Sequence, residues 1–135
     1  MAGFIFNRGA TGLLDGTITW SSATIKARLV LTSETLSKDS TSMTGIGDAL
    51  TDVTLSGKTG PTEDLANDRV GYDADDPTHS AVAQVAAVNR LVLFKFVTND
   101  AASTPIACLD ITEKTPNGAD VIVTLPAGAT FYTQQ

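Results

Sequence analysis

Cysteine and histidine are almost missing from this chain of 135 residues, which contains only Cys108 and His79. One cysteine cannot form a disulfide within the chain, and structural zinc, haem and iron–sulfur sites need several thiolates or imidazoles. We therefore expect no cofactor and no resident metal. With 42% hydrophobic residues, the chain is nevertheless long enough to bury a core of its own, so we expect a single domain over residues 1–135.

Long apolar runs and positive charge are also scarce. No segment approaches the roughly 18 apolar residues of a membrane span, and the first residues lack the basic-then-apolar order of a signal peptide. Nine Lys and Arg stand against fifteen Asp and Glu, which gives a net charge of -6. Nucleic acids and anionic membranes attract cationic surfaces, so we expect neither as a partner and predict a soluble protein made inside a cell.

The negative charge is concentrated in residues 61–80, which hold six acidic residues and one basic residue. A solvated loop is the simplest interpretation of such a run, and a cation site or a basic docking partner is the alternative. The segment Asp73-Ala74-Asp75-Asp76 has the carboxylates of a calcium loop. It lacks glycine at the sixth position and glutamate at the twelfth, so an EF-hand is excluded. We predict that Asp73, Asp75 and Asp76 contact a basic partner surface.

Threonine alternating with Val, Ile and Leu is typical of half-buried strands, and turn residues separate several such segments. Seven or eight short strands without a repeated strand–helix unit predict an all-β fold, an antiparallel β-sandwich resembling a jelly roll, with little helix. A hairpin turn is expected at 116–118, and 80–88 fits helix and strand about equally well. The expected strands are 17–20, 24–32, 52–58, 69–74, 90–98, 106–111, 120–125 and 130–133.

Two segments stand apart from this strand pattern. Residues 32–51 are rich in Ser, Thr, Gly and Asp and predict a long loop, of the kind that often forms a binding element or a mobile arm. Phe4, Ile5 and Phe6 lie near the start of the chain, where apolar residues indicate an N-terminal arm (1–12) that a partner buries. A first strand of the sandwich is the alternative, and the residues leave both open.

Nucleophilic catalysis would require Ser80 or Cys108 beside His79, with a carboxylate to orient the imidazole. His79 and Ser80 are adjacent, so on a strand their side chains point to opposite faces, and no nucleophile-elbow motif frames either. Strict alternation places Cys108 on the same strand face as Ile106, where a lone cysteine is typically a small apolar filler. We expect no enzyme.

Six segments with strand patterns and turn signals follow one another along the chain: LLDGTITW at 13–20, TIKARLV at 24–30, NDRV at 67–70, DADDPT at 73–78, LVLFK at 91–95 and TPIACLD at 104–110. Together they span most of 13–125 and resemble a family of short virion proteins of tailed bacteriophages and prophages, the head decoration or cement proteins. The resemblance implies a β-sandwich that binds the outer surface of the major capsid protein shell and clamps neighbouring coat subunits. It implies no catalytic residues.

We therefore predict a structural virion protein at the capsid exterior, made in the host bacterial cytoplasm. Its partner would be the major capsid protein, and it would form a homo-oligomer, dimer or trimer, on the shell. The alternative is a receptor- or glycan-binding β-sandwich of a phage tail or virion surface. Sugar sites in such folds usually offer exposed aromatic platforms. This chain has one Trp, two Tyr and five Phe, most of them in strand patterns, which favours the capsid protein.

Overall fold

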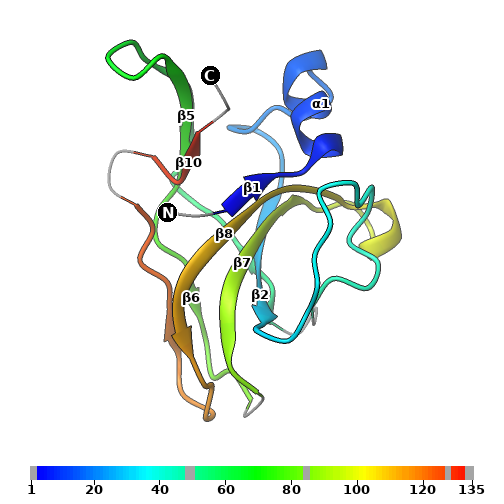
Figure 1. Cartoon of the computed structure of the whole chain (residues 1–135), viewed down its shortest axis with the longest axis vertical. Coiled ribbons are helices and arrows are strands. Elements are labelled where there is room, and N and C mark those ends of the chain that lie inside the picture. Colours follow the sequence, from blue (N-terminus) through cyan, green and yellow to red (C-terminus); the bar gives the residue numbers. More distant parts are fainter. Residues whose placement is uncertain (1–2, 48–50, 84–85, 127–128, 133–135) are drawn as a thin grey trace.

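The computed structural model describes residues 3–47, 51–83, 86–126 and 129–132, and strands dominate it (Figure 1). One sheet has the strand order β1-β8-β7-β2-β3, a second has the order β10-β5-β4, and a third pairs β6 with β9. All these pairings are antiparallel, so the predicted all-β, sandwich-like fold is confirmed. The elements are β1 (Gly3–Ile5), α1 (Asn7–Asp15), β2 (Ile25–Leu31), β3 (Val53–Thr54), β4 (Thr59–Asp64), β5 (Arg69–Asp73), β6 (Thr78–His79), β7 (Val88–Lys95), η2 (Asp100–Ala102), β8 (Thr104–Lys114), β9 (Val121–Ile122) and β10 (Phe131–Tyr132).

The centre of the five-stranded sheet is formed by β2, β7 and β8, where the sequence predicted strands at 24–32, 90–98 and 106–111. Apolar side chains on both faces of these strands are buried, and Leu91 to Phe94 are 0% exposed. One face joins the larger core cluster, which includes Trp20 and Phe131. The other face packs against a smaller cluster around Phe6 and Met43. The sheet is therefore a fully covered middle layer, which explains its nearly continuous apolar sequence.

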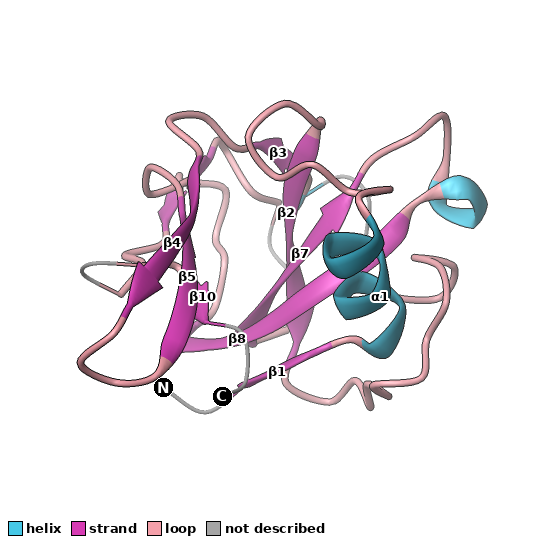
Figure 2. Cartoon of the chain, turned by 90° about the horizontal axis from the view of Figure 1, so that it is seen from above, coloured by secondary structure: helices cyan, strands magenta, loops and turns pink. Residues whose placement is uncertain are grey.

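The three-stranded sheet lies beside the five-stranded one and is joined to it through aromatic packing (Figure 2). The Trp20 ring meets Tyr72 of β5 and Phe131 of β10 edge-on, with centroids 5.8 and 5.2 Å away. The indole N–H of Trp20 donates a hydrogen bond of 3.0 Å to the carbonyl of Asp73. Burial of the ring and this bond together fix where the second sheet attaches to the first.

Within residues 32–47, the loop predicted over 32–51 has neither helix nor strand, and it covers the sheet's second face. Its anchor is Arg28 on β2, whose side chain is fully buried. The guanidinium donates to the Ile46 carbonyl at 2.7 Å and pairs with Asp52 at 2.6 Å and with Asp100 at 2.8 Å. A buried cation needs such compensation, so two carboxylates far apart in sequence hold the loop and η2 against β2.

A helix, α1, occupies residues 7–15, where we expected part of an N-terminal arm. Its two glycines lower the intrinsic helix propensity, so no strong local signal marks it. Gly9 is required by close packing, because a Cβ there would lie 2.5 Å from the Cα of Ile106 on β8. The helix ends at Gly16, which adopts the left-handed conformation with φ 83°. The strand expected at 17–20 is absent, and turns follow the helix instead.

The acidic stretch is more ordered than a solvated loop. β4 and β5 form a hairpin with its turn at 65–68, so the first acidic residues lie on a strand and in a turn. Pro61 sits on β4, which is the edge of its sheet, and a missing N–H is tolerated there. The strand expected at 52–58 is correspondingly shortened to β3.

The prediction of a hairpin around 116–118 is wrong about which strand pairs with the strand that follows the turn. β9, within the expected strand 120–125, pairs with β6 rather than with β8, and Thr78 lies opposite Ile122. A turn signal marks where the chain reverses and does not specify which strand it joins. The ambiguous segment 80–88 contains no helix in its described residues, 80–83 and 86–88, and β7 begins at its end; residues 84 and 85 lie outside the described part.

A register shift between β7 and β8 shows that one predicted strand face was wrong. The register between β7 and β8 shifts between Leu93 and Phe94. Such a shift inserts an extra residue into a strand and changes the face on which neighbouring side chains lie. Ile106 therefore packs in the larger core cluster, whereas Cys108 packs in the smaller one. The expectation that these two residues share a face was wrong because it assumed strict alternation.

Candidate interaction surfaces

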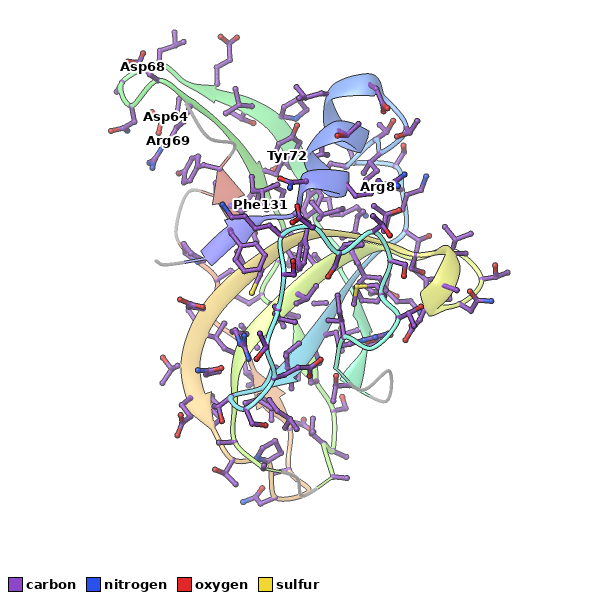
Figure 3. All side chains as sticks on the ribbon, turned by 45° about the vertical axis from the view of Figure 1, so that its right-hand side comes forward. Arg8, Asp64, Asp68, Arg69, Tyr72 and Phe131 are labelled. Carbon is purple, nitrogen blue, oxygen red and sulfur yellow. The ribbon has the colours of Figure 1, made fainter. Side chains whose placement is uncertain are left out.

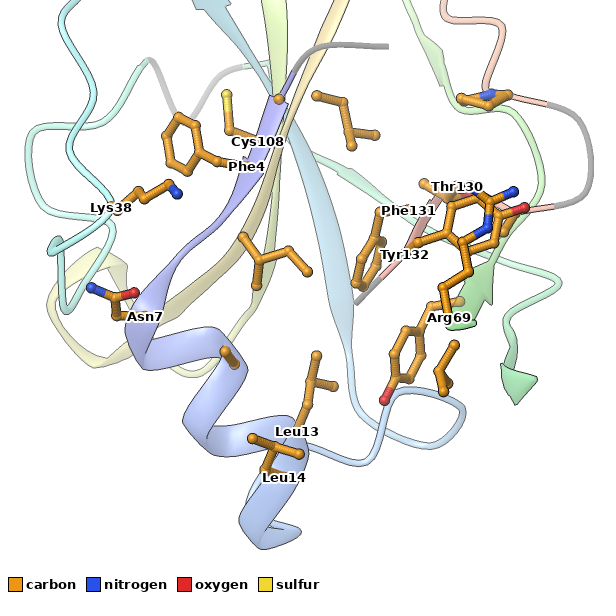
Figure 4. Close-up of a pocket in the computed structure, with 18 residues that line it drawn as sticks. Phe4, Asn7, Leu13, Leu14, Lys38, Arg69, Cys108, Thr130, Phe131 and Tyr132 are labelled. Carbon is orange, nitrogen blue, oxygen red and sulfur yellow. The ribbon is translucent and has the colours of Figure 1, made fainter. Parts of the chain in front are cut away.

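A groove of about 810 Å³ separates the α1–β1 side of the molecule from the β5–β10 side. Figure 4 shows side chains from both walls directed toward it, with Leu13 and Leu14 on α1 and Phe131 and Tyr132 on β10. Leu14 is 88% exposed at the rim. The larger part of the lining is apolar, and an exposed apolar surface of this kind is a candidate protein-binding site.

The charge of the groove is opposite to that of the chain. Among the described residues that line it there are two cations, Lys38 and Arg69, and no Asp or Glu, although the chain as a whole has a net charge of -6. Lys38 comes from the 32–47 loop and Arg69 from β5, so the cations stand at opposite sides of the groove (Figure 4). The groove thus combines apolar side chains with two cationic groups, of which Arg69 is also ion-paired with Asp64 of the β4–β5 hairpin at 2.8 Å.

The β4–β5 hairpin lines one wall of the groove with its strand β5 and extends beyond the body of the domain (Figure 1). Leu65 in its turn is 79% exposed. Asp64 accepts hydrogen bonds from Arg69 at 2.8 Å and from Asn67, and these bonds hold the pKa of the Asp64 carboxyl below its usual range. The Arg69 guanidinium also lies 3.5 Å above the ring of Tyr132. The base of the turn is therefore braced while its apolar tip stays in solvent.

A second exposed surface is the ribbon made by β6 and β9 with the residues that flank them. Ile122 on β9 is 56% exposed. Asp76, just before β6, accepts a hydrogen bond of 2.9 Å from the Leu125 N–H, just after β9. Asp75 is exposed beside Ser56 at 3.4 Å. An exposed apolar side chain and two exposed carboxylates therefore belong to one short antiparallel ribbon.

The predicted contact residues Asp73, Asp75 and Asp76 each have a different hydrogen-bond partner in the structure. Asp73 ends β5 and accepts a hydrogen bond of 3.2 Å from the Thr130 hydroxyl, whereas Asp75 and Asp76 have the partners given above. Within the described ranges, no group of three or more His, Cys, Asp or Glu side chains is placed to hold a metal ion. The carboxylates are thus available as individual surface charges, and their contact with a partner stays a prediction.

The apolar residues near the N-terminus belong to the fold. β1 pairs with β8, with Phe4 opposite Cys108, so residues 3–5 of the predicted arm (1–12) form a first strand, and residues 7–12 belong to α1. Phe6 is fully buried, and its ring packs edge-on against Phe4 with centroids 5.0 Å apart. Ile5 is partly buried against the larger core cluster. Of these three residues, Phe4 and Ile5 still line the groove.

His79 and Cys108, the candidate general base and nucleophile, lie in different parts of the fold. His79 is 1% exposed, its Nδ1 is hydrogen-bonded to the Thr51 carbonyl, and its Nε2 has no partner among the described residues. Burial lowers the pKa of His79. Cys108 is also buried, which raises the pKa of its thiol to about 11, so the thiol stays protonated at neutral pH. His79 lies on β6 with its ring bonded to the Thr51 carbonyl, whereas Cys108 lies on β8 and packs in the smaller core cluster.

No family model, curated protein or solved structure matches the chain. None of the helices in the described residues is long and apolar enough to cross a membrane. The surfaces are therefore interpreted from their own chemistry. Sequence reasoning missed the groove, Lys38 and Leu65; a lone leucine inside the polar run EDLAND was the one available signal for the hairpin tip.

Proposed function

We propose that the protein is a structural component of a tailed-bacteriophage virion, which decorates the outer surface of the capsid and clamps neighbouring subunits of the shell. The similarity of its strand and turn order to head decoration proteins supports this assignment. The observation that carries it is the presence of exposed apolar side chains at two separate ends of the domain. Leu14 on α1 is 88% exposed and Leu65 in the β4–β5 turn is 79% exposed, and Ile122 on β9, which follows the turn at the opposite end, is 56% exposed.

A clamp must contact two neighbours at once, and this arrangement supports such a role. The β4–β5 turn and α1 stand at one end of the long axis, and the turn between β8 and β9 stands at the other (Figure 1). Burial of each exposed large aliphatic side chain at a contact contributes roughly 1.5–3 kcal/mol. We assign the β6–β9 ribbon to the coat protein, because Asp75 and Asp76 there would meet a basic coat surface, and the opposite end to a neighbouring molecule of the shell.

The aromatic side chains bear on the alternative, a glycan-binding module. A sugar ring stacks on an exposed aromatic face. Trp20, Tyr72 and Phe131 are instead packed together in the core, at 2%, 6% and 6% exposure. The ring of Tyr132 is covered by the Arg69 guanidinium. These observations favour the capsid proposal over the glycan one.

Co-sedimentation with empty heads of the phage or prophage that encodes the chain tests the proposal. Ile122→Ser should reduce the bound fraction at limiting protein concentration by about tenfold or more, because the loss of one apolar contact corresponds to about 1.4 kcal/mol or more. Val97→Ser is the matched control, because Val97 is 41% exposed and belongs to neither end. Wild-type protein that stays in the supernatant at every concentration would contradict the proposed function.

The charge of the ribbon is tested separately with Asp75→Asn and Asp76→Asn combined. Asparagine can still accept the bond from the Leu125 N–H, so only the charge changes. Long-range attraction acts mainly on the association rate and is screened by salt. Binding should therefore slow at low ionic strength and remain unchanged at high ionic strength. Equal rates at all ionic strengths would mean that these carboxylates serve solubility only.

A further inference from the structure

The groove and the hairpin beside it have opposite properties. The groove is apolar and carries Lys38 and Arg69, with no carboxylate among its described lining residues. The hairpin tip, residues 63–68 with the sequence EDLAND, carries three carboxylates, no cation and the exposed side chain of Leu65. Opposite charge around matched apolar groups is the usual basis of electrostatic complementarity between protein surfaces. One part of this molecule therefore has the chemistry that another part of it would bind.

The hairpin tip cannot occupy the groove of its own chain, because the tip points away from that groove. Figure 3 shows Asp64 and Asp68 at the far end of the hairpin, while Tyr72 and Phe131 lie at its base and Arg8 lies on the α1 side. Glu63, Leu65 and Asp68 are all exposed. Asp64 is already occupied by Arg69 of the same hairpin. The free carboxylates of the tip are thus those of Glu63 and Asp68 within the described structure.

We propose that the protein self-associates by placing the β4–β5 tip of one copy in the groove of a second copy. Because the hairpin is itself a wall of the groove, the donor and acceptor surfaces adjoin in each chain. A two-fold axis beside the hairpin then brings each tip to the other chain's groove, and both contacts form together in a closed dimer. The pairing extends beyond the proposed capsid function and requires no capsid.

The contacts expected in this dimer follow from the groups that remain available. Leu65 would enter the apolar part of the groove, between Leu13 and Phe4 on one wall and Tyr132 on the other. The Nε–H of Arg69 donates to Asp64, and the terminal nitrogens of Arg69 have no hydrogen bond to described residues. These terminal N–H groups can therefore donate to a carboxylate of the incoming tip. Lys38, exposed on the opposite side, supplies the second cation.

Sedimentation velocity of the purified chain, over a wide range of protein concentration, measures this association. Wild type should form dimers, and Leu65→Asp should shift the midpoint of dimerisation to at least tenfold higher concentration. Unchanged far-UV circular dichroism would show that the variant folds, which its 79% exposed position permits. Lys114→Gln serves as the matched charge control, because it also lowers the net charge by one unit, and Lys114 ends β8 and does not line the groove.

A charge-swap experiment tests which surfaces meet. Lys38→Glu places an acid in the groove opposite the acidic tip, and Glu63→Lys with Asp68→Lys places bases on the tip opposite a basic groove. Each variant alone should shift towards the monomer, because the new acid at position 38 repels the acidic tip in one variant, and the new lysines of the tip are repelled by Lys38 and Arg69 in the other. An equimolar mixture should form the mixed dimer, in which the acidic tip meets the basic groove and the basic tip meets Glu at position 38.

Three outcomes would overturn the proposal. Wild type could stay monomeric at every concentration, which would leave the groove to a different partner. Dimers could persist unchanged in Leu65→Asp, which would place the interface elsewhere. The two charge variants could fail to pair when mixed, although each has shifted towards the monomer, which would show that tip and groove do not meet. Capsid binding is not a readout in any of these experiments, so the failure of either proposal is recognised independently.

Discussion

The five-stranded sheet and the β4–β5 hairpin are both built from antiparallel strand pairs, yet they differ in what their side chains do. Along β7, Leu91 to Phe94 are fully buried, because the sheet is covered on both faces. Along the hairpin, most side chains from Thr62 to Asp68 are exposed. Backbone pairing is thus common to both regions, and only the sheet adds apolar burial. A rigid scaffold and a projecting contact element can therefore be made from the same backbone structure, by changing which side chains are covered.

The largest loss of stability is expected for Leu93→Ala in the five-stranded sheet. Leu93 is 0% exposed, and shortening it leaves a cavity in the larger core cluster. We expect the free energy of unfolding to fall by about 3–4 kcal/mol. Urea denaturation followed by far-UV circular dichroism measures this change. A loss below about 1 kcal/mol would show that the sheet relaxes around the cavity and is less rigid than its burial indicates.

Arg28→Ala should have the next largest effect. The substitution removes the partner of Asp52 and Asp100, whose side chains are 11% and 38% exposed, and releases the loop that covers the second face. Because solvent screens the more exposed carboxylate, we expect a loss of about 2–3 kcal/mol, below the roughly 3–5 kcal/mol typical when one partner of a fully buried pair is removed. Denaturant unfolding gives the value, and Lys26→Ala on the same strand is the control, with an expected change of less than about 1 kcal/mol.

Acidification should destabilise the protein through His79. Burial holds the pKa of the folded imidazole below its usual value of 6.5, so the neutral form is preferred in the folded state. The unfolded chain takes up the proton first as the pH falls, and the stability is therefore fully present above pH 6.5 and is lost below it. Thermal unfolding between about pH 7 and about pH 5.5 should show a falling Tm in wild type and a shallower fall in His79→Gln. Parallel curves would contradict the role of His79.

The smallest effect is expected for Leu65→Ala in the hairpin, the same chemical change as Leu93→Ala. Leu65 is 79% exposed, so its truncation removes little burial. The free energy of unfolding should change by less than about 0.5 kcal/mol, measured at a concentration where the chain is monomeric. A loss comparable to that of Leu93→Ala would mean that the tip packs against its own chain, and it would remove the distinction between the two regions.

Some of the described elements could be predicted from local sequence patterns and others could not. The segments around β2, β5, β7 and β8 were predicted because runs of β-branched and apolar residues carry their own strand signal. α1 was not predicted, because Gly9 and Gly12 oppose a helix locally and only contact with β8 requires it. The partner of β9 was predicted wrongly, since pairing with β6 depends on residues more than 40 positions away in sequence.

The candidate surfaces likewise have some features that could be predicted from the sequence and others that could not. Composition alone indicated an acidic chain with its charge in residues 61–80, and nothing in it located the groove. The groove exists because β1 and α1 from the N-terminal part, β5 from the middle and β10 from the C-terminal part of the chain are brought side by side. The β class, the core strands and the clustering of charge could be predicted, since they depend on residues close together in the chain. The pairing of the strands, the contact of Arg28 with Asp100 and the position of Lys38 across a groove from Arg69 arise only in the folded molecule. Those relations rest on contacts between distant segments, and local sequence carries no record of them.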